Sequence, residues 1–169
     1  EGKVRLGILW SAHFQDTCAA FGMETALMNM IANPEIYEAV NEKVMEFYLK
    51  ANKIFFEATK GKLDAVLIGN DMGSQRGLML SPDMVRQFII PGCKRLVEQA
   101  HSYGVKVIYH SCGSIADVIP ELIGAGVDIV LPIQALSTGM EPIGLTETFG
   151  DQVAFSDGLE TKDQLLNIS

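Results

Sequence analysis

The sequence predicts an α/β fold of the (β/α)8 TIM-barrel type, here a partial barrel of about five parallel strands with helices outside. Three observations predict it: short apolar runs alternate with helical patterns, the connections between them are short, and polar residues follow several of the runs. Strands that are buried on both faces of a parallel sheet have such nearly continuous apolar runs. Repeated strand–helix–strand units then place neighbouring strands in parallel.

Five runs have the composition of buried strands, being short, rich in β-branched residues and bounded by glycine or proline. They are Val4–Trp10, Asp64–Ile68, Val105–Tyr109, Val127–Leu131 and Gln152–Phe155. A complete barrel has eight strands and typically about 250 residues, whereas this chain has 169. We therefore expect one domain, residues 1–169, that is the central part of a barrel with both ends missing.

Helical patterns fill most of the segments between these runs. Asn33–Glu35 has the chemistry of a helix start, and apolar residues recur every three or four positions as far as Ala58, which predicts one long amphipathic helix. Ser81–Asp83 repeats this start, and Pro91 predicts a break near Ile90 because proline lacks a backbone donor. Shorter helices are predicted over Ile115–Ile123, Glu141–Phe149 and Thr161–Asn167.

The stretch after the first strand argues against an open nucleotide-binding sheet, which would need a glycine-rich turn there. Neither G-x-G-x-x-G nor a Walker sequence occurs anywhere in the chain. This stretch is predicted to be irregular, flanked by His13 and Glu24 and with Cys18 in a loop-like segment. Met28 and Met30 are expected to pack in the core.

The overall charge restricts the classes of partner. The chain has a net charge of −8 and a pI of about 4.8. Phosphates would repel it, so we expect a small-molecule substrate and neither a nucleic acid nor a membrane as partner. Three cysteines without regular spacing indicate a reducing, cytoplasmic environment.

Polar residues follow four of the predicted strands, and in a barrel the active site lies at those strand ends. They are Asn70 and Asp71 after the second strand, His110 and Cys112 after the third, Gln134 after the fourth and Asp157 after the fifth. Because the carboxyl ends of parallel strands meet at one edge of the sheet, we expect these residues to lie at the same end.

His110 and Cys112 are two residues apart, a spacing that lets both side chains bind one zinc ion if the chain turns at the strand end. A His-x-Cys pair supplies only two of about four ligands. The alternative is that His110 hydrogen-bonds a neighbouring loop while Cys112 packs as a small apolar side chain. The spacing taken alone favours this alternative.

Asp71 lies in a glycine-rich segment, Gly69–Gly77, that can approach a ligand closely. The Asp71 carboxylate is suited to act as a base, to orient a substrate cation or to bind a metal indirectly. The alternative is that Asn70 and Asp71 only cap the loop. Gln134 places an amide where it can bind a substrate carboxylate or ring nitrogen, and Asp157 is either a site carboxylate or part of a turn.

The ordered series of motifs resembles the superfamily of uroporphyrinogen decarboxylases and cobalamin-dependent methyltransferases over nearly the whole chain. The motifs are Gly22–Glu24, Asn33–Glu35, Gly69–Gln75, Leu80–Pro82, Pro91, Tyr109–Gly113, Gly126–Asp128, Leu131–Gln134 and Phe155–Gly158. In the last of these the family more usually has Gly-Gly or Gly-Asn. The order of the series is far more specific than any single motif.

The resemblance implies an enzyme, and the methyltransferase branch is favoured. That branch binds zinc through His-x-Cys and a distant second cysteine, which would lie beyond Ser169, and it exchanges a methyl group with a corrinoid carried on a partner protein. In this interpretation His110 and Cys112 are zinc ligands, Asp71 and His110 are catalytic, and the substrate-binding residues are Asn70, Gln75, Gln134 and Asp157.

Two alternatives remain. One is a uroporphyrinogen decarboxylase of porphyrin biosynthesis, which acts on a tetrapyrrole without a cofactor; Asp71 would then lie near the pyrrole nitrogens. Decarboxylases resemble one another in an arginine-rich N-terminal segment, whereas the arginines here are scattered. The other alternative is a non-catalytic barrel fragment.

Five strands leave two open sheet edges, and unpaired edges favour association. The inner face of the sheet is expected to carry Val107, Tyr109, Ile129 and Leu131. We therefore expect the isolated chain to form homo-oligomers or to be poorly soluble.

Overall fold

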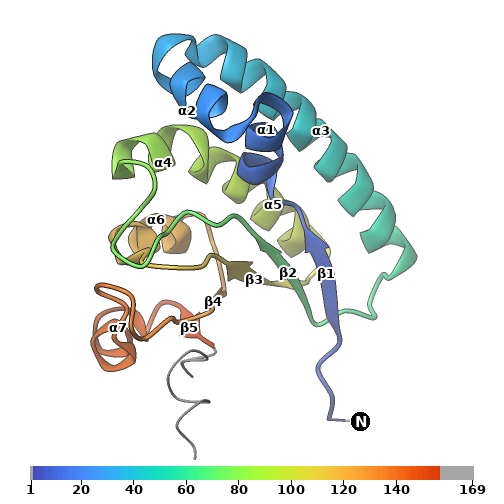
Figure 1. The fold of residues 1–169 in the computed structure, drawn as a ribbon. Helices are drawn as coiled ribbons and strands as arrows, with labels where there is room; N and C mark the ends of the chain where they lie inside the picture. The colour runs from blue at the N-terminus through green and yellow to red at the C-terminus, as the bar shows by residue number, and fades with distance from the viewer. Residues whose placement is uncertain (1, 157–169) are drawn as a thin grey trace, which may run out of the picture.

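A computed structural model describes residues 2–156 of the chain (Figure 1), so Asp157 and the helix predicted over Thr161–Asn167 lie outside the described residues. The strands are β1 Leu6–Trp10, β2 Ala65–Gly69, β3 Lys106–His110, β4 Ile129–Leu131 and β5 Ala154–Phe155. The helices are α1 His13–Phe21, α2 Met23–Ala32, α3 Pro34–Ala58, α4 Pro82–Phe88, α5 Ile90–Ser102, the 3-10 segment η1 Ala116–Val118, α6 Ile119–Gly124 and α7 Pro142–Phe149.

The five strands form one sheet in which every neighbouring pair is parallel and the order is β1-β2-β3-β4-β5. Strands that follow one another along the chain are therefore neighbours in space, as in consecutive βα units of a barrel. This arrangement confirms the predicted α/β fold, a partial barrel of parallel strands. The strands end together, because Gly69 pairs with His110 and His110 pairs with Leu131.

Helices α1 to α5 gather on one side of the strands (Figure 1). The side chains of the sheet alternate between its two faces, and the fully buried set lies under the helices. Its members are Val66 and Ile68 of β2, Val107 and Tyr109 of β3 and Val130 of β4. The assignment of Val107 and Tyr109 to the inner face is therefore wrong.

The other face of the sheet carries Ile8 of β1, Ile108 of β3 and Ile129 and Leu131 of β4. Val107 and Tyr109 pair with the buried Val66 and Ile68 and so face the helices. The side chains of β3 that face away from the helices are therefore offset by one residue from those expected. A single-residue offset changes the face of every side chain in a strand, and alternation alone does not say which set is inward.

The long helix α3 forms as predicted, with Pro34 in its first turn. Its buried face includes Tyr37, Met45, Asn52 and Phe56. It ends at Ala58, three residues before Gly61, which has a positive φ of 70°. Within residues 2–156, no helix, α3 included, has the length and apolar character that crossing a membrane requires.

The predicted break near Ile90 is also confirmed, because α4 ends at Phe88 and α5 begins at Ile90. Pro91 occupies the first turn of α5, where a missing backbone N–H leaves no helical hydrogen bond unmade. Ser81 caps α4 by accepting a hydrogen bond from the Met84 amide, as its position before Pro82 predicts.

The stretch after β1 was predicted to be irregular, and this prediction is wrong: it forms α1 and α2, which meet at Gly22. Neither helix has a side-chain N-cap, so the usual start signal is missing from the sequence. Their packing onto α3 compensates for weak local signals. Cys18 is therefore a buried residue of α1; Met30 lies in the core as expected, whereas Met28 is exposed.

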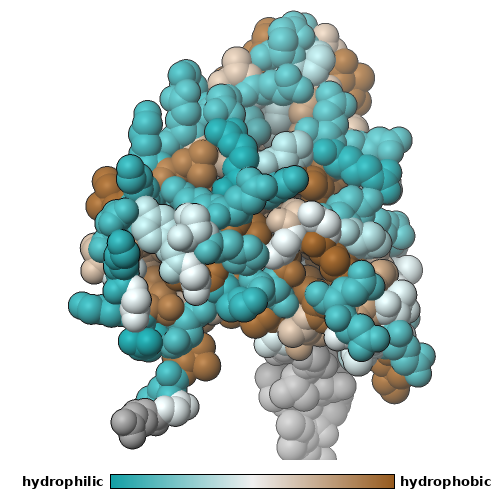
Figure 2. Space-filling model, turned by 180° about the vertical axis from the view of Figure 1, so that it is seen from behind, coloured by the Kyte–Doolittle hydropathy of each residue, from teal (hydrophilic) through white to brown (hydrophobic). Residues whose placement is uncertain are grey.

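Large apolar side chains remain exposed on several parts of the surface, and Figure 2 shows them in separate patches between mostly hydrophilic side chains on the face that it draws. Ile8 of the edge strand β1 is 68% exposed and Ile54 of α3 is 72% exposed. The two isoleucines are thus equally available to solvent, but only Ile8 lies beside unpaired backbone groups of a sheet edge.

We expect the chain to self-associate through the β1 edge and the open sheet face. Ile8→Lys should shift it toward the monomer, because a lysine on an edge strand opposes further strand pairing. Ile54→Lys is the matched control and should leave the association unchanged. Light scattering coupled to gel filtration at micromolar concentrations measures both, and a monodisperse monomeric wild type would contradict the expectation.

His13, the first residue of α1, is fully buried. Its Nδ1 lies 3.0 Å from Asn41 Oδ1, while Nε2 has no hydrogen-bond partner among the described residues. A Cβ added at Gly92 would lie 2.6 Å from the imidazole, so this glycine makes room for the ring. Burial lowers the pKa of His13 to about 4, against an opposing contribution from the Asn41 hydrogen bond.

The stability of the fold should therefore fall on acidification. The unfolded chain protonates His13 near pH 6.5 and the folded chain only near pH 4, so acid favours the unfolded state between these values. The full difference corresponds to about 3 kcal/mol. His13→Gln should remove this part of the pH dependence in urea unfolding between pH 7 and 4, whereas His101→Gln should keep it. Equal slopes in wild type and His13→Gln would contradict the assignment.

Candidate metal centre

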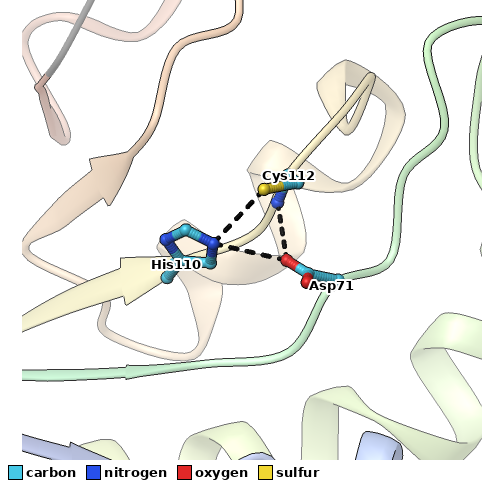
Figure 3. Close-up of side chains that lie close together, drawn as sticks. All are labelled: Asp71, His110 and Cys112. Atoms are coloured by element: carbon cyan, nitrogen blue, oxygen red, sulfur yellow. Dashed lines mark hydrogen bonds and ion pairs between the residues drawn. The ribbon is translucent and has the colours of Figure 1, made fainter.

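Three side chains converge at the carboxyl end of the sheet: Asp71, His110 and Cys112 (Figure 3). His110 is the last residue of β3, Cys112 lies two residues beyond it, and Asp71 lies two residues beyond the end of β2. One ligand atom from each lies within 4.8 Å of the others. The prediction that strand-end residues share one end of the sheet thus holds for these three.

The two separations that involve His110 match those between neighbouring ligand atoms of a tetrahedral zinc ion, and the third pair lies within 4.8 Å. Cys112 Sγ lies 3.4 Å from His110 Nε2, and His110 Nε2 lies 3.4 Å from Asp71 Oδ1. Bonds of about 2.0 to 2.3 Å to a tetrahedral zinc place its ligand atoms about 3.3 to 3.8 Å apart. An imidazole nitrogen, a thiolate and a carboxylate oxygen are also the donor types that zinc accepts. The residues present therefore fit a zinc ion.

The triad is partly accessible, since the His110 and Asp71 side chains are 19% and 34% exposed. The Asp71 carboxylate is held from two sides. Its Oδ1 accepts a hydrogen bond of 2.9 Å from the Cys112 amide, and its Oδ2 accepts one of 3.4 Å from Gln15 Nε2. Gln15 Oε1 in turn accepts from the Asp71 amide at 3.2 Å. Asp71 thus joins the β3 loop to helix α1.

The other two cysteines take no part in the triad. Cys18 and Cys93 are both buried in the hydrophobic core. Burial raises the pKa of Cys18 to about 11 and that of Cys93 to about 12. Both therefore stay protonated at neutral pH and act as small apolar side chains.

Asn70 lies next to the triad in sequence but is buried on the helix side. Its Oδ1 accepts a hydrogen bond from the Phe14 amide, and its Nδ2 donates to the Tyr109 hydroxyl. Both ends of the Asn70 amide are thus used inside the protein. This placement ties β2 to α1 and β3, whereas a substrate-binding role was expected for the residue.

Gln75 and Gln134 form a polar cluster with Ser137 beside the triad. Gln134 Oε1 accepts from the Gly113 amide at 3.0 Å and from Gln75 Nε2 at 3.2 Å. The Ser137 hydroxyl lies 3.4 Å from Gln75 Oε1 and 3.5 Å from Gln134 Oε1, either of which can accept its proton. The structure thus brings Gln75 and Gln134 together next to Cys112, while Asp157, also expected here, lies outside the described residues.

Glycines let the loops of this end approach one another. A Cβ added at Gly69 would lie 2.2 Å from the His110 carbonyl oxygen. A Cβ at Gly113, which has a φ of 81°, would lie 2.5 Å from the backbone of Gly73. No side chain fits at such separations, so these glycines are required by the contact between the β2 and β3 loops.

Two residues of the site, Trp10 and Gln15, were not expected from the sequence. The Trp10 ring lies beside the His110 ring, with their centroids 5.0 Å apart. Gln15 lies in the segment that was expected to be irregular, where no side-chain direction can be inferred. The position of Trp10 at the end of a predicted strand was a usable signal, since strand ends line a barrel site.

Consecutive parallel βα units with polar side chains at the strand ends define this protein as part of a (β/α)8 barrel. The model of the uroporphyrinogen decarboxylase (URO-D) family matches residues 4–135, and the chain belongs to this family. The fold is similar to that of a methyltransferase from Methanosarcina mazei, with a TM-score of 0.69 at 14% identity. That match covers 98% of this chain but only 45% of the methyltransferase. A sequence search of curated proteins found no match.

We expect Gly69→Ala to destabilise the fold by about 1 to 3 kcal/mol, because the added methyl group forces the ends of β2 and β3 apart. The same change should weaken metal binding by the triad. Gly77→Ala is the matched control, since a Cβ at Gly77 meets nothing within 4 Å. Thermal unfolding and zinc titration measure both effects, and equal behaviour of the two variants would contradict this role of Gly69.

Proposed function

We propose that the chain contains the zinc site of a URO-D superfamily enzyme that exchanges a methyl group with a corrinoid (cobalamin) cofactor. The observation that carries the proposal is the convergence of Asp71, His110 and Cys112, whose ligand atoms lie within 4.8 Å of one another. The likeness in fold to a methyltransferase supports the same choice. The corrinoid would be carried on a partner protein, and a small-molecule thiol would be the methyl acceptor.

Each residue of the triad has a defined role in this proposal. His110 would hold the metal through Nε2, Cys112 through Sγ and Asp71 through Oδ1. A zinc ion held there would supply a lowered pKa for a substrate thiol. The resemblance assigns a further zinc ligand to a cysteine beyond Ser169; among the described residues, Asp71 occupies the third place.

Gln134 is suited to bind a substrate acceptor group. The Gly113 amide can only donate, so the Gln134 side-chain oxygen must face it, and this fixes the Nε2 group on the opposite side. That Nε2 has no partner among the described residues and would donate to a carboxylate or carbonyl of the substrate. Gln75 would hold Gln134 in this orientation.

A uroporphyrinogen decarboxylase is the second candidate, which the family match supports. Its tetrapyrrole carries several carboxylates that need cationic partners. Arg5, Arg86 and Arg95 are each engaged with acidic side chains away from the triad. Arg76, the arginine of the glycine-rich loop, is left for such a role, which favours methyl transfer over decarboxylation.

Zinc analysis of the purified chain tests the proposal. The wild type should bind one zinc ion per chain, and Cys112→Ala should lower the affinity at least about 100-fold, because it removes a direct ligand where even an outer partner matters 10- to 100-fold. Cys18→Ala is the matched control, since this cysteine is remote from the triad and its loss should leave zinc bound.

Methyl transfer from a methylcorrinoid to a thiol should be lost together with zinc in Cys112→Ala. A wild type that binds no zinc, or a Cys112→Ala variant that keeps it, would sink the methyltransferase proposal and favour the decarboxylase. Zinc bound without either activity in any assay of the chain would favour a non-catalytic fragment.

A further inference from the structure

The backbone at the end of β1 has an unusual conformation. Trp10 and Ser11 have φ values of 56° and 52°, in the left-handed region that residues other than glycine rarely adopt. The pairing with β2 also slips between Ile8 and Trp10, as in a β-bulge. Bulges often redirect a side chain next to an active site. The strand pairing and the backbone torsion therefore both depart from regular geometry at Trp10.

Buried hydrogen bonds hold this conformation in place. Ser11 is fully buried, and its hydroxyl is 3.0 Å from Asn52 Nδ2 and 3.4 Å from Asn52 Oδ1. Such a strained turn persists only when the surrounding structure determines it, and this strain is concentrated at functional sites in proteins. The turn is thus fixed to helix α3.

The burial of apolar surface does not explain the turn. Trp10 remains 37% exposed, so the left-handed backbone does not serve to place the indole in the core. It places the indole beside the imidazole of His110 instead, with an angle of 48° between the ring planes. The contact leaves His110 Nε2 directed at Cys112 and Asp71.

Gln15, in the first turn of α1, contacts Asp71, a second member of the triad. Its amide makes two hydrogen bonds to Asp71, one to the carboxylate and one from the backbone N–H. A side chain held in this way at both atoms has little freedom to rotate. Trp10 and Gln15 therefore contact two different members of the triad from one short segment of chain.

We propose that the segment Trp10–Gln15 is a positioning device for the metal centre. Trp10 fixes the ring plane of His110, and Gln15 fixes the Asp71 carboxylate. This inference rests on the proposed zinc site, and it adds two positioning residues to it.

Trp10 is the single tryptophan of the chain and reports on the site directly. Titration with Co²⁺ should quench its fluorescence, zinc should reverse the quenching by competing for the site, and His110→Gln should abolish the response. Gln15→Ala should lower zinc affinity roughly 10- to 100-fold, as loss of an outer-shell partner does. Gln87→Ala, an exposed glutamine on α4, is the matched control and should leave the affinity unchanged.

Two further measurements distinguish a positioning role of Trp10 and Gln15 from a purely structural one. Trp10→Leu should lower zinc affinity while Trp10→Phe restores it, and the visible spectrum of the Co²⁺-loaded protein should change in Gln15→Ala at an unchanged melting temperature. If wild type binds zinc and both Gln15→Ala and Trp10→Leu bind it equally well, the positioning role alone is overturned. If wild type binds no zinc, the metal site and the positioning role fail together.

Discussion

The close approach of β2 and β3 at Gly69 and His110 is the constraint on which the rest of the site depends. Gly69 pairs with His110 in the parallel ladder, and the backbone N–H of Asn70 donates a hydrogen bond to the His110 carbonyl. Because both strands end at this pair, the residues that follow them leave the sheet at the same height. Asp71 and Cys112 therefore come into contact, and the Cys112 backbone amide donates a hydrogen bond to the Asp71 carboxylate.

The opposite end of the sheet contains a different kind of interaction. Asp128 accepts hydrogen bonds from Lys106, His101 and the Val107 amide. Burial works to raise the pKa of Asp128, but these donors outweigh it and the pKa is lowered. His101, near the end of α5, thus contacts the residue just before β4. Ion pairs therefore fasten the amino ends of the strands, while the carboxyl ends keep groups available for a ligand, a division typical of barrels.

The sequence was sufficient for the strands and the order of the units, because buried parallel strands leave continuous apolar runs that need no partner to be recognised. It also placed Asp71, His110 and Cys112 at strand ends, and parallel pairing made their meeting predictable. It did not reveal the inward face of β3, because Val107 and Ile108 are equally apolar and only the packing of α5 decides between them. Helices α1 and α2 were not predicted for a related reason: they lack side-chain N-caps, and their stability comes from contacts with α3.

The long helix α3 holds the segment after β1 at two points. Asn52 bonds Ser11, and Asn41, 11 residues earlier, accepts from Thr17 and contacts His13. Eleven residues make about three helical turns, so both amides lie on one face of a rod roughly 37 Å long. Residues some 40 positions apart in the chain thus form one mechanical unit. A substitution at Asn52 would therefore act on the triad, which Asn52 does not touch, by changing the backbone torsion of the turn at Ser11.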